Sequence, residues 1–139
     1  MSFLSRFFFF TYIGLVTIAG FWGAFINPYF DFDLLFHFDP HVLSDHARIN
    51  LLSQYRFLRA LELGFGLFAL LFYQKIFEVR TFNILFLTVM GSGIVARLVS
   101  WWADGQPNYL TLFFLSYELL GWIVIFIYTH KTRKQGADR

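Results

Sequence analysis

Four long apolar stretches, separated by short polar segments, dominate the pattern of hydrophobic and polar residues along the chain. They cover residues 7–26, 49–73, 81–103 and 109–129. A helix needs roughly 20 apolar residues to cross about 30 Å of hydrocarbon, and each stretch is long enough. Lipid cannot satisfy exposed backbone amides, and barrel strands are about half this length. The pattern therefore predicts an all-α polytopic membrane protein of four transmembrane helices.

The connections between these stretches predict how the helices are arranged. Residues 74–80 and 104–108 are short links, which make neighbouring helices antiparallel. Pro107 lies in the second link and is well placed to open the last helix. The first stretch is longer than the apolar core of a signal peptide and no Ala-x-Ala pattern follows it, so we expect a retained anchor. We expect a single domain over residues 1–139, folded as an up-down bundle of four helices.

Composition agrees with a membrane protein and excludes several other classes. Of the 139 residues, 58% are hydrophobic and 14% are charged, whereas soluble domains have about 45–50% and about 25%. The chain has no cysteine and a net charge of +2. These figures argue against a soluble domain, a disordered chain, a disulfide scaffold and a nucleic-acid-binding module.

Lysine and arginine are concentrated on one side of the predicted bundle. On that side they occupy the chain start, the 74–80 link and the tail of residues 130–139: Arg6, Lys75, Arg80, Lys131, Arg133, Lys134 and Arg139. The opposite side carries only Arg48, within the loop of residues 27–48. The positive-inside rule predicts that both termini face the cytoplasm. The 27–48 loop is rich in aromatic residues, so we expect it to fold back over the bundle or lie among lipid headgroups.

Charged residues within the spans are the strongest functional signal. One such residue facing lipid costs about 2.5–3.5 kcal/mol on insertion scales, so several must face each other or water inside the bundle. They lie in the outer half or centre of the bilayer, where three arginines balance three carboxylates. We expect one inward-facing cluster of these residues with a neighbouring tryptophan: Arg56, Arg59, Glu62, Arg97, Trp101, Asp104 and Glu118.

Glycine and other small residues are expected to let the helices approach closely, because packing holds membrane helices together. Gly20, Gly23 and Ala24 lie on the first span, and Gly64 and Gly66 lie on the second. On the third span, Ser92, Ala96 and Ser100 form a strip at intervals of four residues, which Gly91 and Gly93 widen. We interpret them as packing residues.

A metal site in the 27–48 loop is a weaker alternative. His37, Asp39, His41 and His46 are residue types that bind zinc. Pro40 interrupts any helical spacing between the first two histidines, and no His-Glu-x-x-His motif is present. We interpret the loop carboxylates, including Asp31, as solvated, and we predict no metal and no cofactor.

Parts of the chain resemble a known family. The second span contains Tyr55-Arg56-Phe57-Leu58-Arg59-Ala60, and the third ends with Arg97 followed by Asp104-Gly105-Gln106-Pro107, with Glu118 in the next helix. Over about residues 52–128 the chain resembles the DUF4345 family of small four-helix bacterial membrane proteins, with a more distant similarity to DoxX-like proteins. The resemblance implies this topology and the importance of Arg97, Asp104, Gly105, Pro107 and Glu118. It implies no reaction.

Two functions from different classes remain open. The first is a bacterial inner-membrane protein whose charged cluster binds a small anionic or amphipathic ligand or a lipid. The second is a non-catalytic accessory subunit, whose cluster is a structural ion network and whose partners are other membrane subunits. An enzyme that uses Glu62 or Glu118 as acid–base is a third alternative, which no motif supports.

Overall fold

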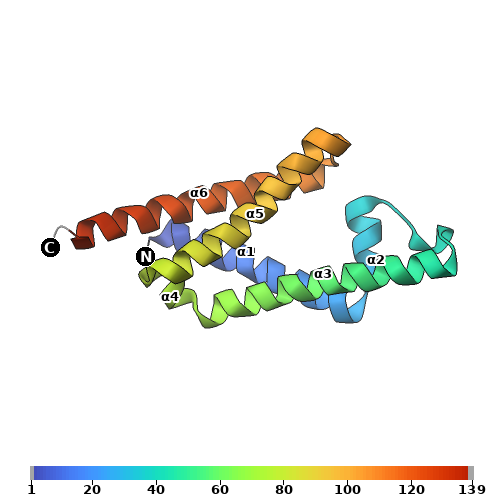
Figure 1. Ribbon diagram of the computed structural model, residues 1–139, viewed down its shortest axis with the longest axis horizontal. Coiled ribbons are helices and arrows are strands. Elements are labelled where there is room, and N and C mark those ends of the chain that lie inside the picture. The colour runs from blue at the N-terminus through green and yellow to red at the C-terminus, as the bar shows by residue number, and fades with distance from the viewer. Residues whose placement is uncertain (1, 138–139) are drawn as a thin grey trace. The chain divides into compact units, whose positions relative to one another are not determined.

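The computed structural model describes the backbone of residues 2–137 and the side chains of residues 2–131. Within the described backbone every regular element is helical, so the all-α prediction is confirmed. The α-helices are shown in Figure 1 and are α1 (Phe3–Phe21), α2 (Pro28–Asp31), α3 (Asp45–Leu71), α4 (Tyr73–Glu78), α5 (Arg80–Asp104) and α6 (Tyr109–Ala137). Two π-helical segments, Trp22–Ile26 and Phe32–Phe36, and a 3₁₀ turn, Pro40–Val42, complete the chain between α1 and α3.

The chain divides into two compact units, which are described separately. One unit is Ile13–Leu70, and the other combines Met1–Tyr12 with Leu71–Arg139. Helix α1 contributes to both.

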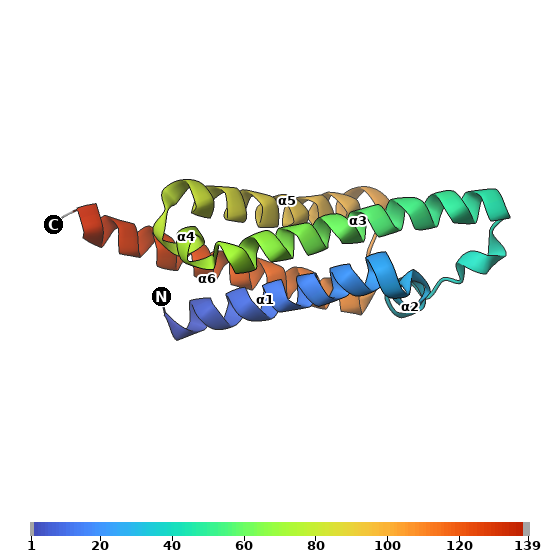
Figure 2. The ribbon, with the colours of Figure 1, turned by 90° about the horizontal axis from the view of Figure 1, so that it is seen from below.

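In the Ile13–Leu70 unit, α1 runs alongside α3 (Figure 2). Two glycines allow this close approach, as the sequence predicted. A Cβ on Gly20 would lie 2.6 Å from the backbone nitrogen of Leu63, and one on Gly66 would lie 3.1 Å from the Cα atom of Thr17. By contrast, a Cβ on Gly64 would meet nothing within 4 Å. Gly20 and Gly66 are thus packing residues, whereas Gly64 faces open space.

The 27–48 loop is more ordered than a solvated linker. Asn27 caps α2 by accepting hydrogen bonds from the backbone of Tyr29 and Phe30, and Pro28 occupies the first helical position. Beyond α2, Phe32 is buried and its ring centroid lies 4.7 Å from that of Tyr55 on α3. The aromatic loop therefore folds back onto a helix, which is one of the two arrangements that its composition predicted.

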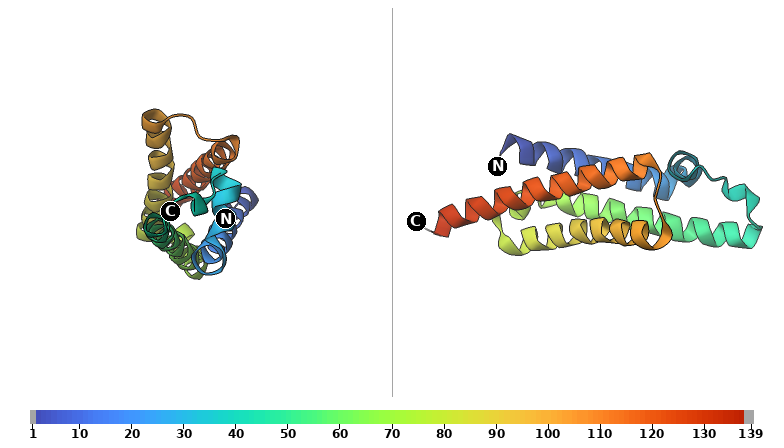
Figure 3. Two further views of the ribbon diagram at one scale, coloured as in Figure 1. Left: turned by 90° about the vertical axis from the view of Figure 1, so that its right-hand side faces the viewer. Right: turned by 90° about the horizontal axis from the view of Figure 1, so that it is seen from above.

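In the other unit, the beginning of α1 packs with α4, α5 and α6. The ring of buried Phe9 lies 5.3 Å from Phe77 of α4 and 5.2 Å from Phe86 of α5. Helices α5 and α6 are joined at one end by the expected turn (Figure 3), in which Gly105 has a φ of +110°. The side chain of Asn108 caps α6, so the helix begins at Tyr109, two residues after Pro107, which we expected to open it.

Two segments that we expected to lie outside the spans, one link and the C-terminal tail, are largely helical. The 74–80 link is largely taken up by α4, because it contains no glycine or proline and can bury Ile76 and Phe77. Helix α6 continues beyond residue 129 to Ala137, through the first part of the predicted 130–139 tail. The side chains of Arg133, Lys134 and Arg139, which contributed to the orientation argument, lie outside the described residues.

Three of the described helical segments are long and apolar enough to cross a membrane: Phe3–Ile26, Arg80–Asp104 and Tyr109–Lys131. They correspond to the first, third and fourth predicted spans and indicate a membrane protein. The second predicted span corresponds to α3, which is also long but contains several charged residues.

Candidate functional site

Arg59 is the centre of an ion network in the Ile13–Leu70 unit. Its Nε and Nη2 atoms each lie 2.9 Å from Oδ2 of Asp31, and its Nη1 atom lies 2.5 Å from Oε2 of Glu62. The side chains of Arg59 and Asp31 are only 11% and 9% exposed. Tyr55 completes the network by donating its hydroxyl to the same Asp31 oxygen over 2.8 Å. Two carboxylates and a phenol therefore surround one buried guanidinium.

Local sequence signals bring Asp31 to this position. The Asn27 cap and Pro28 start a short helix directly after the π-helical segment, and Asp31 is its last residue. Gly23 leaves the necessary space, because a Cβ there would lie 2.6 Å from Oδ2 of Asp31 and 2.7 Å from Cγ of Arg59. Our interpretation of Asp31 as a solvated loop carboxylate was therefore wrong. The cap and the glycine were visible in the sequence, but their joint effect was not.

Arg56 lies one turn before Arg59 on α3 and has a different partner. Its Nη1 atom donates to the backbone oxygen of Ala24 over 2.6 Å. That carbonyl belongs to the π-helical segment at the end of α1. Arg56 thus ties α3 to the end of α1 through a backbone oxygen.

A second ion pair lies in the other unit, between α5 and α6. Nε of Arg97 lies 3.2 Å from Oε2 of Glu118, with the two side chains 40% and 15% exposed. The structure thus pairs the arginine of one predicted span with the glutamate of the next. Because the contact engages only one edge of the guanidinium, other N–H donors of Arg97 point elsewhere.

The remaining predicted site residues lie at the exposed end of α5. Asp104 accepts a hydrogen bond from the hydroxyl of Ser100 over 2.8 Å, and Trp101 is exposed. No arginine pairs with Asp104 among the residues whose side chains are described. The expected cluster, in which three arginines balance Glu62, Glu118 and Asp104, is therefore wrong in its third carboxylate. Ser100 lies one helical turn before Asp104, on the same face of α5, which allows this hydrogen bond.

The candidate metal residues do not gather in one place. Asp39 accepts hydrogen bonds from the backbone and from the ring of His41, at 3.0 and 2.7 Å, and the His41 ring stacks on Tyr29. The backbone N–H of His41 is the main reason that the pKa of Asp39 lies below its ordinary value. Within the described side chains, no three histidines or carboxylates are placed to hold a metal ion.

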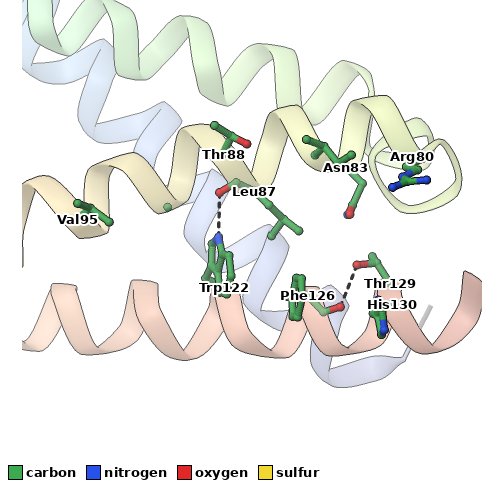
Figure 4. Close-up of a pocket in the computed structure, with 11 residues that line it drawn as sticks. Arg80, Asn83, Leu87, Thr88, Val95, Trp122, Phe126, Thr129 and His130 are labelled. Carbon is green, nitrogen blue, oxygen red and sulfur yellow. Dashed lines mark hydrogen bonds between the residues drawn. The ribbon is translucent and has the colours of Figure 1, made fainter.

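A groove between α5 and α6 is a feature that sequence reasoning missed. It has a volume of about 700 Å³ and is lined mainly by apolar side chains (Figure 4). Trp122 of α6 crosses it and donates its indole N–H to the backbone oxygen of Leu87 over 2.8 Å. Gly91 leaves room for that ring, since a Cβ there would lie 3.1 Å from the indole nitrogen. The groove depends on a glycine and a tryptophan that are about 30 residues apart in the chain. Local hydrophobic patterns do not show that two such distant residues come into contact.

Comparison with known proteins identifies the family. The family model described as a domain of unknown function, DUF4345, matches residues 6–129. The match includes the first span and the aromatic loop, which lie outside the region of resemblance that we recognised. Neither the curated proteins nor the solved structures contain a significant match, and no comparison shows the DoxX-like similarity. Because the family model covers most of the chain, this protein belongs to the DUF4345 family.

Proposed function

We propose that this protein is a bacterial inner-membrane protein with four membrane-spanning helices and both termini in the cytoplasm, and that it binds a small anionic or amphipathic ligand. Helix α3 is the fourth span in this proposal. Its 27 residues correspond to about 40 Å, more than the hydrocarbon thickness. Its central cation Arg59 is paired with both Glu62 and Asp31, which lowers the cost of placing these charges in a membrane.

The orientation rests on the distribution of basic residues. Arg6, Lys75, Arg80 and Lys131 lie near those limits of the proposed spans that an up-down topology assigns to one side of the membrane, and Arg48 lies near a limit that it assigns to the other side. Basic residues in short loops favour the cytoplasmic side.

The ion pair of Arg97 and Glu118 is the observation that carries the binding proposal. Both residues lie within helices that are apolar and long enough to cross a membrane, where ionisable side chains are candidates for function. Arg97 is 40% exposed and its contact with Glu118 engages one edge of the guanidinium. The remaining donors suit a carboxylate or phosphate, which arginine binds through two parallel hydrogen bonds.

Replacement of each partner tests this proposal. We expect hexyl phosphate, but not uncharged hexanol, to raise the melting temperature of the purified protein in non-ionic detergent. Arg97→Gln abolishes the shift, and Arg48→Gln is the control because its partner Asp45 is a solvent-exposed neighbour. Glu118→Gln retains the shift, because Arg97 keeps its charge. If Glu118→Gln lowers stability and no anionic probe shifts the melting temperature of the unaltered protein, the pair is structural and the binding proposal is wrong.

The Arg59 network favours a second candidate function, that of an accessory subunit. Asp31, Glu62 and Tyr55 already engage this guanidinium, which is the arrangement expected of a structural ion network. Large exposed apolar residues such as Phe57 and Phe113 then contact other subunits. Stoichiometric co-purification of another membrane protein in mild detergent supports this function, whereas purification of the chain alone with bound amphiphile supports the first.

A further inference from the structure

The groove between α5 and α6 has the dimensions of a site for one acyl chain. Its lining extends from Arg80 to Val95, which is about 22 Å along α5 at the helical rise. One leaflet of hydrocarbon is about 15 Å thick, half of the bilayer core. The volume of about 700 Å³ lies within the usual range for small-molecule sites. A single extended chain can therefore lie along the groove.

One wall of the groove is a ladder of flat rings on α6. Trp122, Phe126 and His130 follow each other at intervals of four residues. The first two rings are 5.2 Å apart at an angle of 6°, and the second and third are 5.9 Å apart at 12°. The hydrogen bond from Trp122 to Leu87 fixes one end of this ladder against α5. The three rings thus stack on one another along α6 and form one wall of the groove.

The groove changes from apolar to polar at one end. Figure 4 shows Arg80 and Asn83 of α5 at the same end as Thr129 and His130 of α6, whereas Val95 lies far along the groove. Arg80 is the first residue of α5, so this end lies near the limit of the apolar stretch. An anionic headgroup at this end would leave its hydrocarbon chain along the apolar part.

Asn83 is the strongest indication that a ligand contributes an acceptor here. The residue is 2% exposed, and its Nδ2 atom has no hydrogen-bond partner among the described residues. The nearby hydroxyl of Thr129 donates to carbonyls of its own helix, at 2.9 and 3.1 Å. A buried amide donor without an acceptor is costly. Asn83 lines the polar end of the groove, so an acceptor oxygen placed against its amide there would remove this cost.

We propose that the groove binds one long-chain fatty acid, with its carboxylate at Arg80 and Asn83 and its chain along the ring ladder. The single cation of the lining matches a singly charged carboxylate, and the groove between two helices accommodates one chain. The site goes beyond the function proposed for Arg97, which lies 17 residues, or about 25 Å, from Arg80 along α5.

Fluorescence of Trp122 reports on this site directly. The protein has four tryptophans, and the other three are replaced by phenylalanine in a reporter variant: Trp22, Trp101 and Trp102. The reporter is placed in nanodiscs of zwitterionic lipid and titrated with 9,10-dibromostearic acid, whose bromines quench tryptophan on contact. We expect quenching that saturates with the fatty acid. Quenching that rises in proportion to the fatty acid, as for partition into the bilayer, overturns the proposal.

Two substitutions connect the quenching with the polar end. In the reporter variant, Arg80→Gln with Asn83→Leu weakens the apparent affinity at least about tenfold, the effect of losing one charged contact of about 1.4 kcal/mol. The control, Arg48→Gln with Asn50→Leu, makes the same changes at another helix and leaves the affinity unchanged. Asn83→Leu alone keeps or raises the melting temperature, because it removes an unsatisfied donor. The proposal is overturned if all variants bind the fatty acid with equal affinity or if Asn83→Leu causes a large loss of stability. It is also overturned if a brominated phosphatidylglycerol gives equally saturable quenching.

Discussion

Removal of the Asp31 carboxylate is the most direct test of the network around Arg59. In the structure, this carboxylate accepts two contacts from Arg59 and one from the hydroxyl of Tyr55, all at 2.8–2.9 Å and to the same oxygen. Asp31→Ala deletes all three and leaves Arg59 with the carboxylate of Glu62 and the hydroxyl of Tyr55. The buried guanidinium then keeps one carboxylate where it had two.

The expected loss can be estimated from the burial of the pair. Breaking a buried ion pair from one side costs about 3–5 kcal/mol. Because Glu62 still neutralises Arg59, we expect the lower end of this range, about 3 kcal/mol. This is several times the average of about 0.6 kcal/mol for an interhelical hydrogen bond between membrane helices. A loss of this size distinguishes a buried charge pair from an ordinary polar contact.

The assay is equilibrium unfolding by a denaturing detergent, with Asp33→Ala as the matched control. Asp33 is an exposed acidic residue two positions away, and its substitution changes stability by no more than about 0.5 kcal/mol. A double-mutant cycle of Asp31→Ala with Arg59→Met gives a coupling energy of about 1.5 kcal/mol or more. If Asp31→Ala and Asp33→Ala unfold at the same concentration of denaturing detergent, Asp31 does not hold Arg59 and the proposed network is wrong.

Three further predictions concern packing and pH. Gly20→Ala lowers the free energy of unfolding because its Cβ would meet backbone, whereas Gly64→Ala, in open space, keeps or raises it by up to about 1 kcal/mol; equal losses contradict the helix contact. Trp122→Phe keeps a ring but loses the indole hydrogen bond, so it destabilises by about 1 kcal/mol in the same assay; no change refutes that bond. The backbone N–H of His41 lowers the pKa of Asp39 in the folded loop. The ionised carboxylate therefore stabilises the loop fully above the unfolded pKa near 3.9, and this stabilisation is lost as the pH falls through the lower folded pKa. The protection of the His41 amide against hydrogen exchange, measured relative to the intrinsic rate at each pH, therefore falls at low pH, and Asp39→Asn removes that fall.

The sequence predicted α5 and α6 well because their physical determinants are local. Each is a long apolar run with a polar limit, and a turn of glycine and proline lies between them. The pairing of Arg97 with Glu118 follows from that antiparallel connection, since the two charges lie at similar distances from the turn. Hydrophobic periodicity and the cost of placing charges in a membrane were sufficient to predict these helices and their ion pair.

The role of Asp31 depended on information that a pattern does not contain. The position of this carboxylate results from a cap at Asn27, from the space left by Gly23 and from the approach of Arg59, which lies 28 residues later. Each contribution is weak alone, and a loop carboxylate is usually solvated. Helix α4 could not be predicted for a similar reason. Its segment is short enough to be a simple link, and its helix is stabilised by the burial of Ile76 and Phe77, which the local sequence does not show.

Arg59 and Arg97 differ in how fully their guanidinium groups are buried and engaged. Arg59 is 11% exposed and engages two carboxylates, so an added anion would have to displace an existing partner and repel the other. Arg97 is 40% exposed and engages one carboxylate through a single edge, so an anion can add without displacing Glu118. Charge neutralisation of Arg59 therefore opposes ligand binding, whereas the geometry of Arg97 permits it.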